Sequence, residues 1–160
     1  MGNLKAKTHI EKLGFVDKDK KSSEHDKIQL WTYDNVETVI AETIMKNETN
    51  PYKIVNRKWE FPVRYTNGSF QSLIGFIDLR IGVNGKFKVQ GQLVDDSDYP
   101  VFIEVKTQIP NLGELLRQMN TYRNYISGKF IVVAPDDRYK RILNEQGIHF
   151  YKYQDPEKLF

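Results

Sequence analysis

The spacing of apolar and polar residues changes along the chain, and its first part predicts one helix after a polar stretch. Residues 17–27 are polar and without period, which predicts a loop or linker. Apolar residues then recur at helical spacing from Val36 to about Lys46. Asp34 and Glu37 have the spacing of a capping box at the start of this segment. We therefore expect an amphipathic helix there and an ordered core that begins after residue 27.

The middle of the chain predicts strands that are joined by turns. The predicted strands cover residues 53–65, 72–81, 86–94 and 101–106. Turn-forming residues lie between them at positions 66–69, 83–86 and 95–98. This order places an extra hairpin between the strand at 72–81 and the strand at 101–106.

Helical spacing returns after Asn111, which forms an N-cap pair with Glu114. The apolar stripe of this helix consists of Leu112, Leu115, Leu116, Met119, Tyr122 and Ile126. Gly128 ends the helix, and a strand at 129–134, a helix at 135–146 and a strand at 148–153 follow. The alternation predicts an α/β (α+β) fold with a mixed central sheet flanked by helices.

Length and composition predict one globular domain at residues 28–160, behind a basic, partly flexible segment at residues 1–27. Residues 1–21 hold six lysines and three acids, an excess equal to the net charge of +3. This segment can neutralise nucleic-acid phosphates, although a merely solvated terminus is the alternative. The chain has no cysteine, no signal-peptide pattern and no apolar run of membrane-spanning length, so we expect a soluble, cytoplasmic protein with no membrane partner.

Glu104 and Lys106 are the first candidates for chemistry, because strand alternation places them on one face of residues 101–106. A carboxylate there can bind a hard cation, while the neighbouring ammonium orients water or stabilises developing phosphate charge. An ordinary ion pair on a solvated strand face is the alternative interpretation.

Asp78 is the second candidate, since it interrupts an apolar strand. A buried carboxylate without a partner costs several kcal/mol, so Asp78 requires a cation. Either Arg80 on the same face or a metal ion shared with Glu104 would satisfy it.

Gln118 and Tyr122 are four residues apart on the predicted helix and therefore share one of its faces. Their amide and phenol groups can bond to water or to a phosphate, although Tyr122 alone is also explained as a core residue. Arg117 and Arg123 border the same helix as candidate nucleic-acid contacts.

Together, Gly75-x-x-Asp78, Glu104-x-Lys106 and Gln118-x-x-x-Tyr122 resemble the motifs of the PD-(D/E)xK nuclease superfamily, specifically its RecB-like and lambda-exonuclease-like branch. The resemblance covers roughly residues 72–153. It implies a restriction-endonuclease-like αβββαβ core, here with the extra hairpin.

The resemblance implies that Asp78 and Glu104 ligate Mg²⁺ or Mn²⁺, with the carbonyl of Val105 as a further ligand. Lys106 would help to activate water. The Gln118–Tyr122 pair would organise that water and the phosphate.

Some family members add a glutamate from the first helix, for which Glu37 is a better candidate than Glu42 because it borders the apolar stripe. Relatives also use an upstream histidine as a metal ligand. His25 is the available match, but its polar surroundings favour a surface position, and His149 is expected to be structural.

These features predict a metal-dependent nuclease, with DNA favoured over RNA as its substrate and an endonuclease of phage, mobile-element or defence origin favoured. A non-catalytic nucleic-acid-binding or protein-interaction module with the same fold is the alternative, and a subunit that needs a partner is a third. A homodimer is expected only from the family resemblance.

Overall fold

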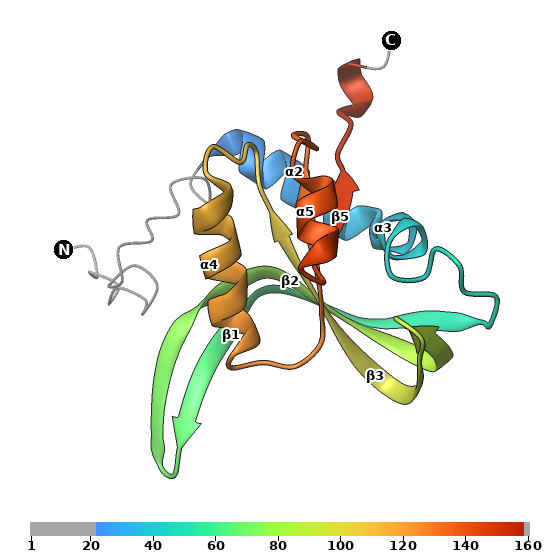
Figure 1. The fold of residues 1–160 in the computed structure, drawn as a ribbon, viewed down its shortest axis with the longest axis vertical. Coiled ribbons are helices and arrows are strands. Elements are labelled where there is room, and N and C mark those ends of the chain that lie inside the picture. Colours follow the sequence, from blue (N-terminus) through green and yellow to red (C-terminus); the bar gives the residue numbers. More distant parts are fainter. Residues whose placement is uncertain (1–21, 159–160) are drawn as a thin grey trace.

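One mixed five-stranded sheet forms the centre of the computed structural model, which describes residues 22–158 (Figure 1). Strands β1 (Tyr52–Asn67), β2 (Phe70–Val89) and β3 (Gln92–Val105) are antiparallel neighbours. Strands β4 (Lys129–Ala134) and β5 (His149–Lys152) continue the sheet in parallel with β3. The predicted α+β architecture with a mixed sheet and flanking helices is confirmed.

The helices pack against the sheet and form two separate apolar clusters with it. Helices α2 (Ser23–Asp34) and α3 (Val36–Glu42) belong to the cluster that includes Ile103 of β3. Helices α4 (Leu112–Arg123) and α5 (Lys140–Glu145) belong to the cluster that includes Phe102. Neighbouring residues of β3 therefore face opposite clusters, as the predicted strand alternation requires. A short 3₁₀ helix, Pro156–Lys158, follows β5, and within residues 22–158 no helix is long and apolar enough to cross a bilayer.

Helix α2 corrects the expectation of a loop at residues 17–27. It begins at Ser23, where the Ser22 side chain accepts a hydrogen bond of 3.0 Å from the backbone N–H of His25. Trp31 stacks on Tyr151 of β5, with ring centroids 5.7 Å apart. Such contacts hold the helix in place. The sequence did not reveal it, because its exposed side is too polar to show a clear helical period. The first part of the expected loop, residues 17–21, lies outside the described residues.

The capping box predicted at Asp34 is also wrong, because Asp34 is the last residue of α2. Helix α3 follows after Asn35 and has no side-chain cap. It ends at Glu42, earlier than predicted. Helix α5 is likewise shorter than the predicted 135–146 helix, because the Asp136 carboxylate accepts hydrogen bonds from Arg138 in the turn that precedes it.

The tight turn predicted at residues 83–86 does not exist, since β2 runs through it. Gly85, with φ of +152°, lies at a register shift in the pairing of β2 with β3. The chain reverses instead at Gln90 and Gly91, which both have positive φ and lie between the paired residues Val89 and Gln92. The predicted extra hairpin and the turn at 95–98 are therefore extensions of β2 and β3.

At Glu60, which has φ of +46°, the side chains of β1 switch from one face of the sheet to the other. Trp59 stacks on Tyr33 at the end of α2, whereas Phe61 contacts Phe102 in the cluster under α4. Trp59 pairs with Leu79 and Phe61 with Ile77, so the residue of β2 at this crossover is Asp78. Beyond it the two strands continue as a curved ribbon past the end of β3 (Figure 1).

Gly128 permits the close approach of the chain to β3 just before β4. A methyl group added at Gly128 would lie 2.6 Å from the Pro100 carbonyl oxygen, and the residue has φ of +154°. We expect Gly128→Ala to lower the free energy of unfolding by about 1–3 kcal/mol, because a backbone oxygen cannot move aside cheaply. Urea denaturation would measure this loss. The matched control is Gly113→Ala in α4, expected to stay within about 1 kcal/mol of the wild type; an equal loss in both variants would contradict the steric explanation.

Candidate functional site

Asp78 and Glu104 lie where β2 separates from β3. The last residue pair of the ladder is Leu79 with Ile103, so the next position along places Asp78 opposite Glu104. Opposite residues of an antiparallel ladder project from the same face. Both residues are buried, with exposed fractions of 2% for Asp78 and 0% for Glu104. The sheet therefore brings together two buried carboxylic acids that are 26 positions apart in the sequence.

The Asp78 carboxylate is fixed by two donors from different elements. Its Oδ2 atom accepts a hydrogen bond of 2.7 Å from the backbone N–H of Val105 and lies 3.3 Å from Nε2 of His25. Its backbone carbonyl accepts a bond of 3.2 Å from the Gln29 side chain. Asp78 thus joins the end of β3 to helix α2.

His25 is buried with an exposed fraction of 1%, so the expectation of a surface position is wrong. The signal that would have revealed it is its spacing from Ile28 and Thr32, which are also buried and share one face of α2. Lys27 fastens this helix by an ion pair of 2.7 Å with Asp155, which lowers the pKa of the Asp155 carboxyl.

Arg80 does not neutralise Asp78, which corrects one of the two expected partners. Its guanidinium binds both carboxylate oxygens of Asp98 on β3, at 2.9 and 3.2 Å. This pairing lowers the pKa of Asp98. Arg80 therefore serves the β2–β3 hairpin and not the carboxylate at the crossover.

Gln118 and Tyr122 lie on the side of α4 that faces the sheet, and both are buried. The Gln118 amide lies 3.5 Å from the Tyr122 hydroxyl, which donates a hydrogen bond of 3.0 Å to the Phe76 carbonyl. Phe76 precedes Asp78 by two residues on β2. The predicted Gln118–Tyr122 pair is thereby attached to the same strand as Asp78, and Tyr122 is also a member of the core under α4.

Lys106 follows the last residue of β3 and is half-buried. Its backbone N–H donates to the Val133 carbonyl at 2.9 Å, so the contact with β4 continues one residue beyond the strand. Glu104 and Lys106 thus lie at the C-terminal end of β3, the central strand of the sheet. Val105 between them is buried and uses its N–H to bind Asp78, while the role of its carbonyl stays a prediction.

The structure does not bring Glu37 to this site. Its exposed carboxylate forms an ion pair with Arg57 of β1. Arg123 is held by the Gln146 carbonyl at 2.8 Å and lies over the Phe130 ring, which directs it toward α5. Arg117 is exposed on α4 directly before Gln118.

Among residues 22–158, no group of three or more His, Asp and Glu side chains is gathered closely enough to form a metal site by itself. The side chains around the crossover are chemically suited to a cation nonetheless, because they combine two carboxylates with an imidazole. We call His25, Asp78, Glu104, Lys106, Gln118 and Tyr122 the crossover site.

No protein-family model, curated protein or solved structure matches this chain.

Proposed function

We propose that the protein is a metal-dependent nuclease that hydrolyses phosphodiester bonds of DNA at the crossover site. The observation that carries the proposal is that Asp78 and Glu104 are both buried where the β2–β3 ladder ends, with the Asp78 carboxylate bonded to the backbone N–H of Val105. Two neighbouring carboxylates out of water repel each other when both are ionised, and a divalent cation removes that repulsion. Such a cation would lie at the end of β3, where Glu104 precedes Lys106 by two residues in the sequence.

Asp78 and Glu104 would hold Mg²⁺ or Mn²⁺, both of which prefer carboxylate oxygens. Bound there, the ion supplies polarisation of a phosphoryl oxygen and acidification of water. His25 contributes by its contact with Oδ2 of Asp78, which fixes the direction of that carboxylate. Glu37 has no part in this proposal.

The remaining residues of the crossover site act on the substrate and on water. Lys106 would stabilise negative charge on the phosphate or orient water. Tyr122 is bonded to the Phe76 carbonyl and lies 3.5 Å from the Gln118 amide, so its main role would be to hold Gln118 in position on α4. Arg117 is the better placed of the two candidate arginines for a phosphate contact, because Arg123 is held by Gln146.

A panel of single-stranded, double-stranded and branched DNA, with RNA beside it, tests the activity. We expect at least one DNA to be cleaved with Mg²⁺ or Mn²⁺ and to remain intact in EDTA. Calorimetric titration with Mn²⁺ alone provides a separate readout, in which Glu104→Gln should weaken metal binding at least about tenfold. Salt-sensitive DNA binding with no cleavage and no Mn²⁺ binding would refute the nuclease and favour the binding-module alternative.

A further inference from the structure

A second polar site lies beside β5, in a pocket of about 290 Å³ between α3, the β2–β3 turn and α5. We call it the β5 pocket. The polar residues that line it and carry the argument are Lys46, Asn47, Gln90, Lys140, Asn144 and His149. His149 projects from the sheet face opposite Phe150, which belongs to the cluster under α4. The β5 pocket lies at the β5 edge of the sheet, and none of its lining residues belongs to the crossover site.

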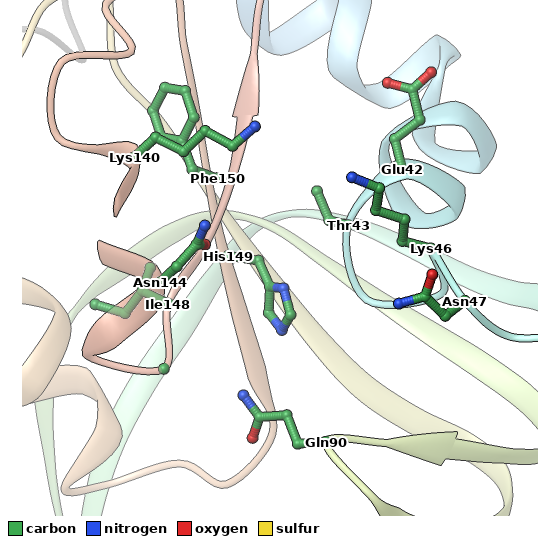
Figure 2. A pocket seen from close by; sticks show the side chains of 11 residues that line it. Glu42, Thr43, Lys46, Asn47, Gln90, Lys140, Asn144, Ile148, His149 and Phe150 are labelled. Atoms are coloured by element: carbon green, nitrogen blue, oxygen red, sulfur yellow. The ribbon is translucent and has the colours of Figure 1, made fainter. Parts of the chain in front are cut away.

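The lining of the pocket carries more positive than negative charge. Lys46 and Lys140 extend their ammonium groups into it from opposite walls (Figure 2). In the part of the chain that the structure describes, neither ammonium forms an ion pair. Glu42 is the one acidic residue of the lining. Two like charges aimed into one hollow are complementary to an anion placed between them.

Lys129, next to the lining residues Gln90 and His149, adds further positive charge near the pocket. Burial and the nearby Arg123 lower the pKa of Lys129, which hydrogen-bonds the neutral side chain of Gln90. Burial and Lys129 in turn lower the pKa of His149. The Nε2 atom of His149 is buried and has no hydrogen-bond partner within residues 22–158. A buried polar atom without a partner is costly, and a ligand that bonds to it recovers that cost.

We propose that the β5 pocket binds the phosphate monoester of a ligand of about mononucleotide size. Lys46 and Lys140 bracket the phosphate, and the amides of Asn47 and Asn144 can donate to its oxygens. Nε2 of His149 is left for a polar group on the rest of the ligand. The volume is at the small end of ligand pockets, which begin at about 300 Å³, and so favours one nucleotide over a longer molecule lying inside.

Calorimetry with inorganic phosphate, adenosine 5′-monophosphate, and one oligonucleotide with and without a 5′-phosphate tests the proposal. We expect adenosine 5′-monophosphate to bind, and Lys46→Met or Lys140→Met to weaken it at least about tenfold. The matched control is Lys53→Met, because Lys53 is an exposed lysine of β1 outside the pocket. Preference for the phosphorylated oligonucleotide over the nucleotide would assign the phosphate to a nucleic-acid end, and the reverse would assign it to a free nucleotide.

The proposal is overturned if none of these phosphates binds, or if Lys53→Met weakens binding as much as the pocket variants do. Both pocket lysines are exposed, so their replacement by methionine should leave the melting temperature nearly unchanged. The measurement involves no cleavage and no metal, and its outcome is therefore independent of the proposed nuclease activity. His149→Gln adds a second check, since it should weaken the nucleotide more than inorganic phosphate.

Discussion

Lys106→Met is expected to lower the rate of metal-dependent DNA cleavage by about 10²–10³-fold, the loss found when one group that stabilises transition-state charge is removed. Methionine retains most of the apolar volume of the lysine side chain, and the backbone N–H that binds Val133 is unchanged. The variant therefore removes the charge at the end of β3 while preserving the strand. Initial rates on a cleaved DNA, with Mg²⁺ at saturation, measure the effect.

The control for this variant is Lys53→Met, which removes the same charge from an exposed position of β1. It should cleave at nearly the wild-type rate. DNA affinity of Lys106→Met, measured in EDTA, should fall far less than its rate, because one surface charge contributes little to a multi-contact interface. Equal losses of rate in the two lysine variants would show that Lys106 contributes only general charge, and the mechanism would have to be abandoned.

The local parts of the crossover site were predictable because they depend on short-range periodicity. Two-residue alternation predicted that Glu104 and Ile103 point to opposite faces of the sheet. The structure agrees, because Phe102 and Ile103 belong to different clusters. Four-residue helical spacing placed Gln118 beside Tyr122, and the Asn111 side chain caps α4 at Glu114 as expected. Each of these inferences needs only the geometry of one element.

The parts that failed depend on contacts between distant segments. His25 lies in a polar stretch where its spacing from Ile28 and Thr32 is the one sequence signal of burial, and its contact with Asp78 joins residues 53 positions apart. Arg80 could pair with Asp78 before it or with Asp98 after it in the sequence. It pairs with Asp98 because the β2–β3 hairpin is long enough to place Asp98 on the neighbouring strand. That length was itself misjudged, because Gly85 resembles a turn residue but serves a β-bulge.

Glu60 shows a further limit of reading strands by alternation. Its positive φ reverses the facing of the ribbon, so that residues two apart, Trp59 and Phe61, pack on opposite sides of the sheet. Simple alternation through Asp78 would have assigned Ile77 and Leu79 to one cluster, whereas the structure divides them between two. The Asp78 carboxylate lies at the reversal, where it contacts His25 of α2 and the backbone N–H of Val105.

Asp78→Ala and Asp78→Asn should separate the structural role of Asp78 from its chemical role. The alanine variant removes the acceptor of the buried N–H of Val105 and one contact of His25, that with Oδ2 of Asp78. An unsatisfied buried donor costs about 1–3 kcal/mol, so we expect a loss of at least that size in the free energy of unfolding, measured in urea without metal. Asparagine keeps an oxygen that can accept from Val105, and its loss should be clearly smaller.

Both variants should nevertheless lose DNA cleavage, by at least about a hundredfold, because neither offers a carboxylate to the metal. Stability with and without Mn²⁺ links the two roles: the wild type should gain stability from the ion by mass action, whereas Asp78→Asn should gain little. If Asp78→Asn cleaved DNA at the wild-type rate, Asp78 would be a structural cap of β3 and not a metal ligand. If Asp78→Ala were as stable as the wild type, the contacts with Val105 and His25 would not be what holds α2 against the end of β3.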